Sequence, residues 1–247
     1  MARRFAVSGL APIVVSAAAG WLLAGCGGGG TEAASAGPGA STTISGTLVK
    51  GPVSEATIRA FAVSGGAVGA AIASTTTDSA GAFVLVMGNY AGPVMLQASA
   101  GHFTDEATGT MMPMAASDLM SAVLPTVPAG SNISGIAVTP LTSMAQSMAA
   151  HMSGGLQDAN ITAANAALGS MFMVGDILRV SPMNPLVAGS GAAATPAARN
   201  YGMVLAGMSQ YAKDIGMLTS SGIVTAMMSD ASDGIMDGMA AGVQVGM

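Results

Sequence analysis

The sequence of 247 residues has one cysteine, one tryptophan and few charges: charged residues make up 8% and aromatic residues 4%. A single cysteine excludes an internal disulfide, so packing alone must hold the fold together. Methionine, alanine and glycine replace the missing aromatic side chains, with 21 methionines and 35 glycines. Because many of these residues are small, we expect a thin core of modest stability.

Positive charge is also scarce. After residue 25, five cationic side chains face twelve acidic ones, a net charge of −7; the cations are Lys50, Arg59, Arg179, Arg199 and Lys213. Nucleic-acid binding needs clustered lysine and arginine that displace counterions from phosphates. Five scattered cations do not form such a surface, so we exclude nucleic acid as a partner.

Long apolar runs are confined to the start of the chain. Arg3 and Arg4 precede an apolar stretch from Phe5 to Ala24. No later stretch reaches the roughly 18 to 20 uninterrupted apolar residues that a membrane-spanning helix needs. A positively charged N-terminal region, an apolar middle and small residues at the cleavage site are typical of an export signal. Residues 1–25 are therefore predicted to be a signal peptide.

The stretch Leu23-Ala24-Gly25-Cys26 resembles the bacterial lipobox, and it contains the only cysteine. The resemblance implies cleavage between Gly25 and Cys26 and lipidation of Cys26, usually with three acyl chains; two or more chains anchor a protein stably. Gly27, in place of the aspartate that retains enteric lipoproteins in the inner membrane, favours the outer membrane. We expect a protein of the cell envelope that its lipid anchor holds to the membrane, on the periplasmic or surface face.

Residues 26–43 combine the lipidated cysteine with a segment rich in glycine, serine and alanine. This segment buries too little apolar area to order itself, and we interpret it as a flexible tether.

Residues 44–132 are typical of β structure, because β-branched and alternating apolar residues are separated by Gly, Pro and Asp. Five strands are predicted, over 44–50, 56–63, 71–77, 82–87 and 93–98. Before the fourth strand, Asp78 can accept bonds from backbone amides ahead of it and Gly81 can adopt a positive φ, which predicts a turn. Residues 101–109 are expected to form an exposed loop.

The segments ISGTLVKGPVSEATI (44–58) and TTDSAGAF (76–83) resemble the carboxypeptidase regulatory-like family, with Glu55 where that family often has glycine. The resemblance implies a transthyretin-like, or prealbumin-like, antiparallel β-sandwich. It implies no chemistry, since the family is a non-catalytic accessory module. An accessory module of an envelope peptidase system is therefore one alternative function.

From Thr139 onward the apolar period becomes helical. Thr139-Pro140 and Thr195-Pro196 are helix starts, each with a hydroxyl cap and a proline at the first helical position. Further helices are predicted over 162–174 and 219–228. The predicted fold class is thus α+β: a small N-terminal antiparallel β-sandwich (44–132), then an α-helical domain with a flexible C-terminal tail (133–247).

Methionines provide a candidate metal site. Thioethers bind Cu(I), and one face of the helix after Thr139 carries Met144, Met148, His151 and Met152. Because methionine also packs irregular cores well, we predict no metal and no other cofactor. A periplasmic copper-binding protein that uses methionine clusters is the other alternative function.

Other chemistry has little support. A triad can be drawn from Ser99, His102 and Asp105, but its spacing matches no nucleophile motif. Turns and solvated loops explain the possible Ca²⁺ ligands better than a metal does; these are Asp78, Asp105, Glu106, Asp230, Asp233 and Asp237. We predict that the protein is not an enzyme.

The leading function is a non-catalytic binding or structural role in the envelope. Val84, Val86 and Met95 alternate onto the strand face opposite Phe83, Leu85 and Val94, so both faces are partly apolar. One face forms the core, and the other must meet the helical domain or a partner. We expect that partner to be another envelope protein.

Overall fold

The structure is a computed structural model that describes residues 39, 41–115 and 117–246. The predicted signal peptide (1–25), the predicted cleavage site at Gly25 and Cys26, and most of the predicted tether (26–43) lie outside the described residues. At the end of the tether, Thr42 is buried: its amide bonds to the carbonyl of Gly88 and its hydroxyl to that of Tyr90. The fold therefore begins slightly before residue 44.

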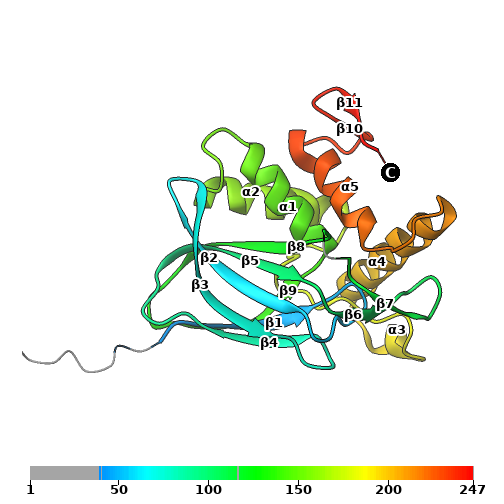
Figure 1. Ribbon diagram of the computed structural model, residues 1–247, viewed down its shortest axis with the longest axis horizontal. Helices are drawn as coiled ribbons and strands as arrows, with labels where there is room; N and C mark the ends of the chain where they lie inside the picture. Colours follow the sequence, from blue (N-terminus) through cyan, green and yellow to red (C-terminus); the bar gives the residue numbers. More distant parts are fainter. Residues whose placement is uncertain (1–38, 40, 116, 247) are drawn as a thin grey trace, which may run out of the picture. The chain divides into compact units, whose positions relative to one another are not determined.

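The described chain forms a mixed α+β fold with several antiparallel sheets and five α-helices (Figure 1). The strands are β1 (Thr43–Leu48), β2 (Thr57–Ser64), β3 (Ala67–Thr76), β4 (Ala82–Val86), β5 (Gly92–Ser99), β6 (His102–Thr104), β7 (Met111–Pro113), β8 (Met120–Val127), β9 (Asn132–Val138), β10 (Met239–Ala240) and β11 (Val243–Gln244). The helices are α1 (Pro140–His151), α2 (Asp158–Met171), α3 (Ser190–Ala193), α4 (Pro196–Asp214) and α5 (Gly222–Asp230), with a 3₁₀ turn at Ala231–Asp233. Among the described residues, no helix has the length and apolar character that crossing a membrane requires.

The five strands predicted between residues 44 and 98 are confirmed as β1 to β5, and they divide between two sheets. One sheet has four antiparallel strands in the order β3-β2-β5-β8. The other has the order β4-β1-β9, with β1 antiparallel to β4 but parallel to β9. Residues 133–138, an extended piece that we placed at the start of the helical part, are extended as expected but belong to the sheet of β1. A period of two identifies a strand and its faces but neither its partner nor its direction.

A close approach of two backbones fixes the register between β1 and β9. The pairing shifts between Ile44 and Gly46. A Cβ at Gly46 would lie 1.9 Å from the carbonyl oxygen of Ile136, which no side chain permits. Glycine is required here because of this contact rather than because of its φ angle.

One apolar core joins the two sheets to the helices. The three-stranded sheet contributes Ile44, Leu85 and Ile136, and the four-stranded sheet contributes Ile58 and Leu96. The helices add Leu141, Met144, Ile161, Leu168 and Leu205. The core therefore extends across the expected domain boundary at residue 132.

Side chains of α1 and α2 bond to the outer edge of β8, where a strand would otherwise leave its backbone unpaired (Figure 1). The amide of Ser121 donates to Ser143 Oγ at 2.8 Å, and its carbonyl accepts from Thr142 Oγ1 at 2.7 Å. Asn165 Nδ2 of α2 donates to the carbonyl of Val123. Hydroxyl and amide side chains thus replace a neighbouring strand.

The two helix starts predicted at Thr-Pro pairs are confirmed. Thr139 caps α1 in a capping box with Thr142, and Thr195 accepts from the amide of Ala198 at the start of α4. Thr139 Oγ1 also bonds to the hydroxyl of Tyr201, a fully buried residue of α4 whose hydroxyl donates to the carbonyl of Ile177. Burial raises the pKa of Tyr201, so its hydroxyl remains protonated.

The C-terminal segment is folded up to residue 246, where we had expected a flexible tail. After α5 the chain forms the 3₁₀ turn and the β10–β11 hairpin. Asp230, expected in a solvated loop, is buried, and its Oδ1 accepts from the amides of Asp237 and Gly238. One carboxylate thus organises a glycine-rich segment that has little apolar area of its own.

Candidate functional site

Lys50 is the centre of the most unusual polar cluster in the described chain. It follows β1 in a tight turn, where Val49 and Pro52 form an isolated bridge. Its side chain is 0% exposed. Lysine is almost never fully buried unless it is paired, so its partners define the cluster.

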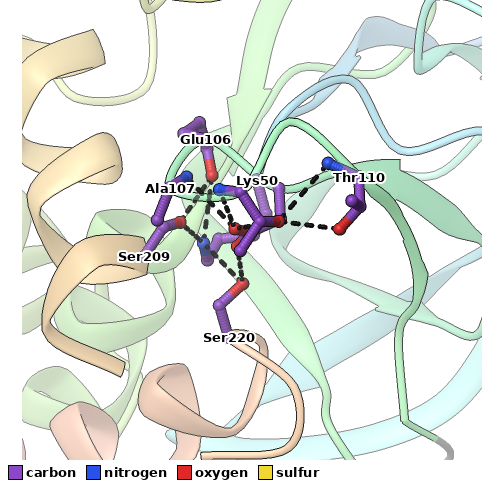
Figure 2. Close-up of polar contacts among 8 residues, drawn as sticks. Lys50, Glu106, Ala107, Thr110, Ser209 and Ser220 are labelled. Atoms are coloured by element: carbon purple, nitrogen blue, oxygen red, sulfur yellow. Dashed lines mark hydrogen bonds and ion pairs between the residues drawn. The ribbon is translucent and has the colours of Figure 1, made fainter. Parts of the chain in front are cut away.

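Three elements converge on the Lys50 amine (Figure 2). Nζ lies 3.3 Å from Glu106 Oε2, which comes from the loop between β6 and β7, and it also donates to Ser209 Oγ of α4. Ser220, just before α5, accepts at 3.3 Å. The ring centroid of Phe103 lies 5.5 Å from Nζ, within the range of a cation–π interaction. We call Lys50, Asp105, Glu106, Ser209 and Ser220 the lysine cluster.

Asp105, which precedes Glu106 in the loop between β6 and β7, completes the lysine cluster. Its Oδ1 accepts from the amides of Ala107 and Thr108 and from the Thr108 hydroxyl, at 2.9 to 3.1 Å. Its other oxygen accepts from Ser220. Residues 101–109 are therefore not the exposed loop that we expected, since Asp105 and the side chain of Glu106 are buried. Two backbone amides and two hydroxyls thus satisfy the buried Asp105 carboxylate.

Burial and partners shift two pKa values in the lysine cluster. Burial lowers the pKa of Lys50, and the nearby Glu106 carboxylate only partly offsets this effect. For Asp105, burial would raise the pKa. The hydrogen bonds from Ser220 and Thr108 and the charge of Lys50 outweigh that effect, so its pKa lies below the ordinary value.

Ser209 Oγ lies between an amine and a carboxylate, because it accepts from Lys50 and donates to Glu106 Oε2 at 2.5 Å. Neighbouring bases activate serine nucleophiles in this way. Here, however, both Ser209 and Lys50 are completely buried, so no substrate can reach the hydroxyl in this conformation. A cavity of about 130 Å³ beside the cluster is lined by Glu106, Pro52 and Leu205 but not by Ser209. The lysine cluster therefore links the end of β1, the β6–β7 loop, α4 and the start of α5.

The residues of the drawn triad are not assembled. His102 is exposed, and its Nδ1 lies 3.4 Å from Glu55 Oε2 at the surface. Asp105 instead bonds to Ser220 and Thr108, as described above. Among the described residues, no group of three or more His, Cys, Asp or Glu side chains could hold a metal ion.

The candidate copper ligands of α1 divide between core and surface. Met144 and Met148 are buried in the apolar core. His151 Nδ1 lies 2.8 Å from the carbonyl oxygen of Ser147, and the side chain of Met152 is exposed. Two of the four side chains therefore pack among core residues, with Met144 fully buried and Met148 8% exposed.

The structure places Asp78 and Gly81 in the turn between β3 and β4. Asp78 Oδ1 accepts from the amides of Ala80 and Ala82 at 2.8 and 2.9 Å. Gly81 has a φ of +75°, and a Cβ there would lie 2.5 Å from the carbonyl oxygen of Leu48.

The predicted second apolar face also divides between two environments. Met95 lies in β5 and is buried. Val84 and Val86 lie in β4, at the edge of the other sheet, and are 58% and 60% exposed. Three residues predicted from one alternating pattern thus lie on two different sheets.

Sequence reasoning missed the lysine cluster. Its hydrogen bonds join residues 56 to 170 positions apart, and no local pattern encodes such pairs. The one available signal was the rarity of cations after residue 25, because a lone lysine directly after an apolar strand needs a partner.

Comparisons with known proteins add little. No protein-family model matches the chain, and no curated protein matches it. Among solved structures, a 9R-lipoxygenase from Cyanothece PCC8801 matches at 12% identity with a TM-score of 0.26. The match covers 45% of this chain and 18% of the lipoxygenase chain. A likeness this weak carries no argument about fold or function.

One prediction must nevertheless be corrected. We predicted that the protein is not an enzyme, but the matched structure belongs to an enzyme, and the likeness does not establish that this protein is non-enzymatic. Composition and motif spacing had excluded only the familiar catalytic patterns.

Proposed function

We propose that this protein is a lipid-anchored protein of the bacterial cell envelope that binds a protein partner through an apolar surface on β4. The observation that carries the proposal is the exposure of Val84 and Val86, which lie two residues apart on one side of an edge strand.

The surroundings of the two valines fit a binding surface. Ser45 and Thr43 of β1 lie opposite Val84 and Val86 in the antiparallel register, and both are half-buried. The patch therefore combines exposed methyl groups with hydroxyls and carries no charge. Depletion of charge at the centre is typical of protein interfaces. We call these four residues the β4 patch.

The anchor and the finer fold are part of the same proposal. Cys26 would receive the lipid, and residues 27–41 would tether the folded part to the outer membrane. For the β-rich part we propose a prealbumin-like sandwich of the carboxypeptidase regulatory-like type, followed by a helical domain. Two observations support this: the two sheets share one core, and the segments that carry the family resemblance cover β1, the start of β2 and the Asp78 turn.

Photo-crosslinking in intact cells tests the partner. A photoreactive amino acid replaces Val84 in the full-length protein, and Val68, an exposed valine of β3, is the matched control position. We expect a discrete adduct from position 84 that is absent from position 68 and disappears when Val86→Ser is added. Identical adduct patterns at both positions, or an adduct that Val86→Ser does not change, would refute the β4 patch as the binding surface.

Mass spectrometry of the purified protein tests the anchor separately. A diacylglycerol thioether on Cys26 is expected, and Cys26→Ser should release the protein from the membrane fraction. An unmodified thiol, or an intact Met1, would refute anchoring without bearing on the β4 patch.

A further inference from the structure

The buried pair of Lys50 and Glu106 brings an amine and a carboxyl group together with almost no exposure to solvent. Nζ lies 3.3 Å from Glu106 Oε2, and the two side chains are 0% and 2% exposed. Because Cδ is bonded to Oε2, the amine nitrogen lies within about one bond length of the roughly 3–3.5 Å separation from which a reaction can proceed. Desolvated lysine amines act as nucleophiles toward carbonyl carbons. The pair therefore holds both reactants of an amide bond in one site.

The Ser209 hydroxyl connects the two reacting groups (Figure 2). Its Oγ accepts from Lys50 Nζ and donates to Glu106 Oε2 at 2.5 Å. A proton can therefore pass from the amine to the carboxyl oxygen through one hydroxyl. The nitrogen must lose this proton before it can attack, and burial favours the loss because it lowers the pKa of Lys50. The Glu106 carboxylate opposes the loss, so we expect a reaction that is slow compared with folding.

We propose that Lys50 and Glu106 condense slowly in the folded protein, which forms an isopeptide bond between Nζ and Cδ. The electron pair of Nζ forms the new bond to Cδ, and the bond between Cδ and Oε2 breaks. Of the three hydrogens on the ammonium group, one stays on the amide nitrogen and the other two leave with Oε2 as water. Atoms and charge balance, and the step needs no oxidant, reductant or cofactor. Before condensation the two side chains form the ion pair described above.

The surroundings of the pair suit the products. The cavity of about 130 Å³ that Glu106 helps to line is larger than the roughly 30 Å³ that a water molecule occupies, so it can receive the released water. The amide has no charge, whereas the ion pair keeps two charges buried. The bond joins residues 56 positions apart, in a chain whose single cysteine excludes an internal disulfide. It uses no residue of the β4 patch, so it is independent of the proposed partner binding.

Peptide mapping with trypsin detects the isopeptide bond. In the unreacted chain trypsin cleaves after Lys50, Arg59 and Arg179. An acylated Lys50 resists cleavage, so the peptide that ends at Arg59 stays joined to the peptide 60–179, and the branched product weighs one water less than the two peptides together. The purified full-length protein is incubated, digested at intervals and analysed by mass spectrometry. We expect the branched fraction to rise with time in the folded protein and to stay at its starting value in guanidinium chloride, where the two side chains are no longer held together.

Two variants test the proton path and the choice of lysine. Ser209→Ala keeps the amine and the carboxyl group but removes the hydroxyl between them, so the rate should fall by about a hundredfold or more. Lys213 Nζ also lies 3.3 Å from an oxygen, the carbonyl of Ala107, but a backbone carbonyl has no oxygen that can leave as water. Lys213→Met should therefore leave the rate unchanged.

The wild-type time course decides the proposal even where a variant unfolds. Complete cleavage after Lys50 at all times would overturn it, and so would equal rates in folded and unfolded protein. A branch at Asp105 in place of Glu106, located by fragmentation of the branched peptide, would also overturn it. An unchanged rate in Ser209→Ala would overturn the proton path through that hydroxyl.

Discussion

Replacing Lys50 by methionine should remove a large part of the stability of this protein. Methionine has a similar length and no charge, so the apolar stem of the side chain can stay in place. What disappears is the ion pair with Glu106 and the donor to Ser209 and Ser220. Glu106 then has a buried carboxylate without its cation, and breaking a buried pair from one side costs about 3–5 kcal/mol.

Two comparisons make this prediction specific to the pair. Lys213→Met removes an exposed cation whose Nζ lies 3.3 Å from the carbonyl of Ala107, and it should change the free energy of unfolding by less than about 0.5 kcal/mol. The double variant Lys50→Met with Glu106→Gln removes both charges, and it should recover about half of the loss or more.

Denaturant unfolding followed by circular dichroism measures these differences. Small globular proteins have only about 5–15 kcal/mol of stability in total, so the Lys50→Met midpoint should shift clearly while the slope stays constant. A Lys50→Met loss below about 1 kcal/mol would refute the view that the cluster holds an obligatory ion pair. If the double variant loses as much free energy of unfolding as Lys50→Met and Glu106→Gln lose together, the two charges do not depend on each other.

Two further predictions concern Asp105 of the lysine cluster and the threonine caps of α1 and α4. Because the folded pKa of Asp105 is lowered, its contribution to stability is present above the ordinary pKa of about 3.8 and is lost as pH falls further. The free energy of unfolding should therefore fall more steeply below pH 3.8 in the wild type than in Asp105→Asn, and parallel profiles would contradict this. Thr139→Val removes the buried cap of α1 and the bond to Tyr201, so it should cost about 1–2 kcal/mol. Thr195→Val removes only the exposed cap of α4 and should cost less. Thermal unfolding measures both losses of stability, and equal losses in the two variants would contradict this prediction.

Local features of this fold could be predicted from the sequence. Alternating residues identified β1 to β5, and Thr139-Pro140 and Thr195-Pro196 identified the starts of α1 and α4. Each of these signals acts over a few residues, through side-chain alternation or a cap bond to a nearby amide. The turn at Asp78 could be predicted for the same reason, because its side-chain hydrogen bonds join residues only two and four positions apart.

Long-range pairing could not be predicted in this way. Nothing local distinguishes residues 132–138 as a parallel partner of β1, or indicates that Ser143 would bond to the edge of β8. Asp105 was expected in an exposed loop because acidic residues are mostly solvated. It is buried because three donors of its own loop and Ser220 satisfy its oxygens.

The lysine cluster and the scarcity of bulky side chains are best understood together. The face that α4 buries combines Tyr201, Leu205 and Met208 with the small residues Gly202, Ser209 and Ala212, and apolar packing is non-directional, so by itself it leaves the helix some freedom to slide. Directional bonds remove that freedom. A shift of α4 by one turn, about 5.4 Å, would carry Ser209 away from Lys50 and Glu106 and separate Tyr201 from Thr139. Each separated group would be a buried polar atom without a partner. A buried ion pair adds little net stability compared with an apolar replacement, so fixing the position of α4 is the larger consequence of this cluster.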